Sequence, residues 1–239
     1  MKLFKNISPA ETLATSLALA VASVSPLAFD VSATGSVTLH ELGQIAILPA
    51  VAIWLLLVAS ASAMKWRRLA GAGLLAIGAG ILGTAAMEVV RITGFRVFDA
   101  MPGSMPMLIG VLLTDRFMEG PDLWSNLLGW GDHFWNGIGV AFIYVVLFGR
   151  MRWWVGVIYA FLIATVFMMG PVMNIIGAGH FGQEFAPVKF PLTVYGAHIA
   201  YGAVIGWLVQ RSALAQGHLL CDLFGIRIGG LERIVDASS

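Results

Sequence analysis

Six long apolar stretches occupy most of this 239-residue chain and constrain its fold more than any other feature. A helix needs about 20 apolar residues to cross the hydrocarbon core of a bilayer. A membrane barrel strand needs only about 10 residues, which alternate in polarity. These runs are too long and too uniformly apolar for barrel strands, so they predict a bundle of transmembrane helices. They cover residues 12–29, 39–63, 69–90, 133–149, 153–176 and 192–210.

The charge content supports the same class. Charged residues make up 11% of the chain, against about 25% in a soluble domain, so they are too few to cover a water-facing surface. The net charge of +1 provides no basic field for nucleic acid, and we predict none as a partner. The single cysteine, Cys221, excludes an internal disulfide and a cysteine-built metal cluster. We therefore expect an all-α, polytopic integral membrane protein in contact with the lipid bilayer.

The distribution of Lys and Arg predicts the orientation. Most of them fall in one alternating set of connections, which the positive-inside rule assigns to the cytoplasm. Six spans then leave both termini cytoplasmic in a bacterial inner membrane, with one membrane domain over residues 1–211 and an amphipathic tail over residues 212–239. The outer connection, residues 91–131, holds an apolar segment too short to span, which predicts a re-entrant or interfacial element.

The first apolar stretch fits two interpretations. Lys2 and Lys5 precede it, and Val31-Ser32-Ala33 resembles a cleavage site, so the segment is typical of a signal peptide as well as of a retained helix. The predicted orientation of the other stretches is the same in both cases.

Histidines suggest where function resides. His40, His133 and His198 lie near the predicted outer ends of three different stretches. Neutral imidazole is the commonest transition-metal ligand, and a carboxylate completes a site or orients an imidazole. Glu88, at the predicted outer end of the third stretch, is the candidate carboxylate, although Arg91 is close enough along the helix to neutralise it. His180 is a further candidate metal ligand.

Several cofactors fit such a set. Three histidines and a carboxylate suit zinc, iron or copper. Most of the 11 methionines lie in the predicted outer half, which favours copper, although methionine also fills gaps in apolar cores. A b-type haem held by His133 and His198, with Tyr195 and Tyr201 beside it, is the other cofactor hypothesis. A hydrogen-bonded network without any cofactor is the alternative.

Three functions follow from these alternatives. The first is a periplasm-side metal or haem site for redox chemistry, electron transfer or metal handling. The second is a cofactor-free accessory subunit in a larger membrane complex or a homo-oligomer. The third is a transporter of a small solute or metal, which we expect less because the predicted spans carry no ionisable residue at mid-depth. The chain has no P-loop, GxSxG or HExxH motif that would indicate a particular enzymatic reaction. Whether the protein is an enzyme is left open.

Residues 105–208 carry glycine and aromatic motifs between apolar runs. They are Pro106 with Leu108-x-Gly110, His133-x-x-x-Gly137 followed by Tyr144 and Gly149, Gly156, Pro171, Gly179-x-Phe181-Gly182, and His198-x-x-Tyr201-Gly202-x-x-x-Gly206. This part of the chain resembles the YagU-like group of small bacterial inner-membrane proteins. The resemblance implies a helical inner-membrane protein without an established reaction. It includes His133 and His198 in the shared pattern, whereas His40 matches nothing in it.

Overall fold

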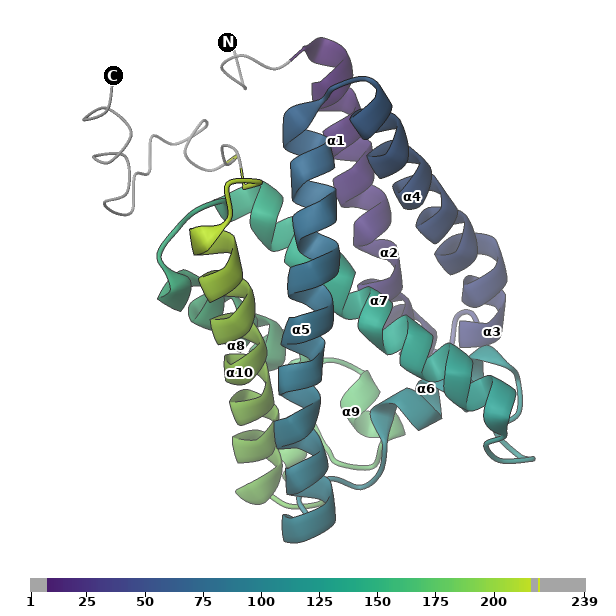
Figure 1. The fold of residues 1–239 in the computed structure, drawn as a ribbon. Coiled ribbons are helices and arrows are strands. Elements are labelled where there is room, and N and C mark those ends of the chain that lie inside the picture. The colour runs from purple at the N-terminus through teal and green to yellow at the C-terminus, as the bar shows by residue number, and fades with distance from the viewer. Residues whose placement is uncertain (1–7, 216–218, 220–239) are drawn as a thin grey trace.

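The computed structural model describes residues 8–215 and 219, and the regular structure within them is helical (Figure 1). The elements are α1 (Pro9–Ala22), α2 (Val24–Ala33), α3 (Leu39–Leu42), the π-helix η1 (Gly43–Ile47), α4 (Leu48–Ala63), α5 (Arg67–Phe98), α6 (Met105–Leu113), α7 (Leu123–Phe148), α8 (Trp153–Met169), α9 (Val172–Ile175), the 3₁₀-helix η2 (His180–Gly182) and α10 (Lys189–Arg211).

Among the residues that the structure describes, five helical segments are long and apolar enough to cross a membrane, as expected of a multi-pass membrane protein. They are Pro9–Ala33, Leu39–Ala63, α5, α7 and α10. Large apolar side chains on their outer faces are exposed, such as Leu56, Leu82 and Val89, as expected for helices in contact with lipid. The fifth predicted stretch instead gives α8, a helix of 17 residues that ends before Gly170-Pro171. The prediction of an all-helical membrane protein is therefore confirmed.

Small residues bring three of these helices into close contact. Helix α5 packs against both α7 and α10, and α10 also packs along α8 (Figure 1). A Cβ atom added to Gly80 of α5 would lie 2.6 Å from the Cα of Ile138 in α7. One added to Gly83 would lie 2.8 Å from the ring of Tyr201 in α10. The glycines thus allow the approach typical of membrane helices, and α5 lies at the centre of the contact.

Hydrogen bonds bring the starts of α1, α5 and α8 to the same end of the bundle as the end of α10. The Glu11 carboxylate accepts the backbone N–H groups of Arg68 at 3.2 Å and Leu69 at 3.3 Å. The side chain of Gln210 accepts the N–H of Trp153 at 2.8 Å. The opposite end carries α6, α9 and η2 (Figure 1). Nearly all of the predicted tail, residues 212–239, lies outside the described residues.

Two helices extend further toward that opposite end than the sequence predicts. Helix α7 begins at Leu123 instead of residue 133, and α5 continues to Phe98 instead of residue 90. Asp122 caps α7, because its side chain accepts the N–H of Ser125 at 2.7 Å, and this bond holds the pKa of Asp122 below its usual value. Gly129 then packs against the backbone of α6 at Pro106 and Gly110, inside the part of α7 that was assigned from the sequence to the outer connection.

Candidate functional site

A buried, hydrogen-bonded group of three ionisable side chains joins α5 to α7. Glu88 Oε1 accepts hydrogen bonds from Nε2 of His133 at 2.9 Å and from Nε of Arg91 at 2.6 Å. The other oxygen, Oε2, pairs with Nη2 of Arg91 at 2.5 Å. The side chains of Glu88 and Arg91 are 6% and 8% exposed, and that of His133 is 14% exposed. We call Glu88, Arg91 and His133 the triad.

The triad lies well inside its helices. At ~1.5 Å of rise per residue, Glu88 is about 15 Å before the end of α5, and His133 is about 15 Å after the start of α7. From the sequence we expected Glu88 in the last turn of its helix and His133 within the first two turns of its own. Both expectations are wrong. Both residues lie deeper because α5 continues past residue 90 to Phe98 and α7 begins at Leu123, ten residues before His133. Two candidate spans therefore carry ionisable side chains about 15 Å from a helix end, which bears on the transporter hypothesis.

His198 lies at the level of the triad. Helices α5 and α10 are antiparallel, with Gly94 against Thr193 and Gly83 against Tyr201. Glu88 and His198 both fall between these two contacts, so they occupy the same layer. The Tyr201 hydroxyl donates to the Gly137 carbonyl at 2.6 Å, and Gly137 is one turn along α7 from His133.

Hydrogen bonds define which ring nitrogens carry protons. Nδ1 of His198 donates to the Val194 carbonyl at 2.8 Å, so Nε2 is its lone-pair nitrogen. His133 donates from Nε2 to Glu88, which leaves Nδ1 as the lone-pair nitrogen of its neutral form. Both rings are therefore oriented by an oxygen acceptor, as metal-ligating histidines usually are.

The remaining candidates lie elsewhere. His40 donates from Nδ1 to the Leu113 carbonyl at 2.7 Å, and its Nε2 contacts Gln44 at 3.0 Å. Figure 1 shows its helix, α3, on the opposite side of the molecule from α10. His180 is exposed in η2. The Tyr195 hydroxyl lies 3.1 Å from that of Thr165, and its ring stacks on Phe161.

The structure therefore does not bring His40, His133 and His198 together in one site. Across residues 8–215 and 219, no group of three or more His, Cys, Asp or Glu side chains is arranged to hold a metal ion. Five of the methionines that favoured copper lie in apolar surroundings. Met101, Met168 and Met173 pack into one apolar cluster with Phe190, and Met105 and Met107 line a separate pocket.

A second polar contact lies on another face of α7 and was missed from the sequence. Asp132 accepts a hydrogen bond from the Ser25 hydroxyl of α2 at 2.6 Å and from Asn136 Nδ2 at 3.0 Å. Several buried polar atoms have no partner in the described part of the chain: Arg91 Nη1, Thr84 Oγ1 and Asn136 Oδ1. Buried polar atoms normally have partners, so these positions call for water or a polar ligand. In the sequence, the polar residues Ser25 and Thr84 within apolar runs could have indicated these buried polar positions.

The fold and the site together define a polytopic helical membrane protein with an ionisable group buried among its spans. No family model, curated protein or solved structure matches the chain. The resemblance to the YagU-like group stays a prediction.

Proposed function

We propose that this protein conducts protons across a bacterial inner membrane and that the triad is its proton-handling site. One observation carries the proposal, namely that Glu88, Arg91 and His133 form a buried hydrogen-bonded chain well inside α5 and α7. Ionisable side chains within membrane helices are costly and rare, and they typically mark the path of an ion or proton. The transport hypothesis from the sequence was a transporter of a small solute or metal, and the triad leads us to propose the proton instead.

The chemistry of the three groups suits this role. Carboxylate and imidazole both exchange protons, and the 2.9 Å contact between Glu88 and His133 allows a proton to pass without movement of the backbone. The Arg91 guanidinium holds the carboxylate in place through two hydrogen bonds. His198, in the same layer, offers the next lone-pair nitrogen. Water at the unpartnered atoms of Thr84 and Asn136 would extend the chain of hydrogen bonds.

The orientation belongs to the same proposal. We propose six spans, in which α8 is the short fifth span along the chain and Trp153 and Trp154 anchor its first turn. The connections that carry Arg67, Arg68, Arg150 and Arg152 lie at one end of the bundle, which supports assigning that end to the cytoplasm. The triad then lies nearer the periplasmic surface.

Proton flux into liposomes tests the proposal. The protein is reconstituted in vesicles with an internal pH-sensitive dye, and a potassium diffusion potential set by valinomycin drives proton entry. We expect the wild type to acidify the vesicles well above the rate of empty vesicles. Glu88→Gln and His133→Ala should each lower the excess rate at least tenfold, whereas His180→Ala, which changes an exposed histidine, should leave it unchanged.

Two results would contradict the proposal. Wild-type flux no faster than that of empty vesicles would show that no proton path exists. Equal flux in the wild type and both triad variants would show that protons take a path that does not involve the triad.

A metal site at His133 and His198 is the second candidate function. The observation that favours it is the pair of lone-pair nitrogens, Nδ1 of His133 and Nε2 of His198, in one layer beside Glu88. Zinc, iron or copper fits these ligands. Haem fits less well, because Tyr201 contacts Gly137 directly one turn away, and a porphyrin would force α7 and α10 apart.

Elemental analysis of the purified protein separates this candidate from the first. A metal site predicts close to one metal per chain in the wild type and loss of that metal in the His133→Ala/His198→Ala double variant. The matched His40→Ala variant should retain it, since His40 lies elsewhere in the fold. Metal at the background level in the wild type would reject the candidate and leave the proton proposal intact.

A further inference from the structure

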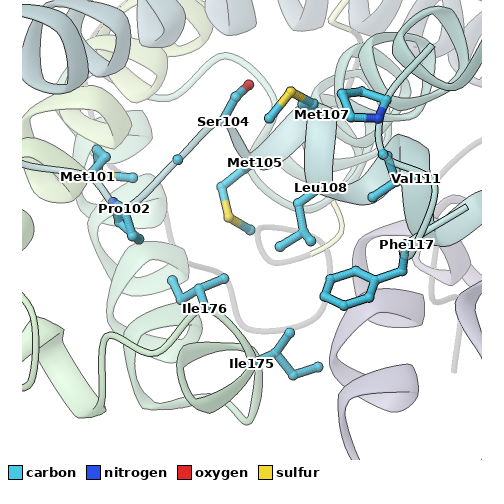
Figure 2. A pocket seen from close by; sticks show the side chains of 13 residues that line it. Met101, Pro102, Ser104, Met105, Met107, Leu108, Val111, Phe117, Ile175 and Ile176 are labelled. Atoms are coloured by element: carbon cyan, nitrogen blue, oxygen red, sulfur yellow. The ribbon is translucent and has the colours of Figure 1, made fainter.

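An apolar cavity lies at the end of the bundle that carries α6 and α9, opposite the basic end. It has a volume of about 310 Å³ and is enclosed by the segment around the start of α6, by residues 117–121 and by Ile175 and Ile176 (Figure 2). Figure 2 shows Met105, Leu108 and Phe117 directed toward the cavity from one side and the two isoleucines from the other. Ser104 is the one polar side chain among its described lining residues, and its hydroxyl is directed away from the space.

Large exposed apolar side chains lie around the cavity, and the ion-paired side chains of Arg116, Glu119 and Asp122 lie on the same connection. Phe117 of the lining is 63% exposed and Ile175 is 45% exposed. The neighbouring Met118 and Leu123 are 92% and 78% exposed. A patch of this kind on a multi-pass membrane protein contacts lipid rather than water, because burial in hydrocarbon removes the cost of hydrating it. The cavity is partly open, and Phe117 and Ile175 of its lining present apolar side chains at the protein surface.

We infer that this cavity is a lipid site that takes up one acyl chain from the surrounding bilayer. Its volume is at the lower end of the ~300–1,000 Å³ range of small-molecule sites, which suits part of a single hydrocarbon chain. The lining offers almost no side-chain hydrogen-bonding group, so it selects a ligand without polar groups. Met101, Met105 and Met107 have flexible thioether side chains that adapt to a chain of variable shape. The inference is independent of proton conduction.

Photolabelling in reconstituted vesicles tests it. The vesicles contain a phospholipid with a diazirine in one acyl chain, and the labelled residues are mapped by mass spectrometry after irradiation. We expect labels on Met105, Leu108 and Ile176 in the wild type, in addition to general labelling of exposed residues such as Leu82. Leu108→Trp fills the cavity and should lower the label on Ile176 several-fold.

A matched variant controls for the added ring. Leu56→Trp places the same side chain on the exposed face of α4, and it should leave the label on Ile176 unchanged. Met105→Phe is a second filling variant, and the elution volume on size-exclusion chromatography reports whether each variant folds. Label on Ile176 that is no stronger than on Leu82, or that both folded filling variants leave unchanged, would overturn the inference.

Discussion

At the scale of single residues, Glu88 is held by two different kinds of partner. Arg91 lies on the same helix and carries a guanidinium, a group that proteins do not deprotonate, whereas His133 comes from another helix and carries an imidazole, a group that exchanges protons. The fixed charge stabilises the carboxylate, and the titratable partner gives it a route for proton exchange. This division means that the structural and functional roles of the triad can be separated by mutation.

Arg91→Met should be strongly destabilising, because it leaves the Glu88 carboxylate buried without its permanent counter-charge. Breaking a buried ion pair on one side typically costs about 3–5 kcal/mol, whereas replacing both partners by apolar residues is often close to neutral. We therefore expect thermal unfolding in detergent, followed by tryptophan fluorescence, to show a large loss for Arg91→Met. The Glu88→Leu/Arg91→Met double variant should recover most of that loss.

The double variant also distinguishes a purely structural ion pair from a proton path. It should regain stability but not proton flux, because it lacks the Glu88 carboxylate. A double variant as unstable as Arg91→Met, or one with wild-type flux, would contradict the roles given to these two residues.

At the scale of elements, the approach of α5 to α7 sets the geometry of the triad. Gly80 is the contact point, since an added Cβ would meet the backbone of α7, which cannot turn aside as a side chain can. Gly78 is on the same helix and has no heavy atom within 4 Å of such a Cβ. These two glycines therefore form a matched pair.

Gly80→Ala should destabilise the protein by about 1–3 kcal/mol, as overpacking typically does, and should also reduce proton flux by separating Glu88 from His133. Gly78→Ala should be neutral or stabilising by up to about 1 kcal/mol, because alanine is the better helix former. Thermal unfolding and vesicle flux measure both effects. Equal behaviour of the two variants would mean that α5 and α7 do not pack through Gly80.

The helical class and the approximate positions of the spans could be predicted from the sequence, because long apolar runs leave few alternatives. The ends of α5 and α7 could not. Glycine and charge near residues 129–132 suggest a loop, and only the Asp122 cap and the packing against α6 make that region helical. The pairing of His133 with Glu88 could be anticipated from the sequence, because both residues were candidate ligands of the same site. The separation of His40 from them depends on the arrangement of helices in three dimensions, which apolar runs do not encode.

At the scale of the whole molecule, the first apolar segment is an integral part of the bundle. Glu11 binds the start of α5, Ser25 binds Asp132 of α7, and the Ala22 carbonyl packs against Gly139. Removal of the segment would leave the Asp132 carboxylate without its Ser25 donor and would uncover the face of α7 around Gly139. From these contacts we propose that the segment is a retained helix and not a cleaved signal peptide.

Intact-mass spectrometry of the protein purified from membranes should accordingly find a mass that includes residues 9–33. Ser25→Ala should lower the unfolding temperature, since it leaves the partly buried Asp132 carboxylate with one fewer donor. A mature chain that begins near Thr34 would show that the packing of α1 and α2 does not occur in the membrane.

The most direct test of the account is whether His133 contacts Glu88 in a bilayer. Solid-state NMR of ¹⁵N-histidine-labelled protein in lipid reports the protonation and hydrogen bonding of each ring nitrogen, and His133→Ala assigns the His133 signals. We predict a hydrogen-bonded Nε2 proton on His133 whose resonance shifts in Glu88→Gln but not in Glu41→Gln, a change near His40. A His133 spectrum identical in the wild type and Glu88→Gln would contradict the account.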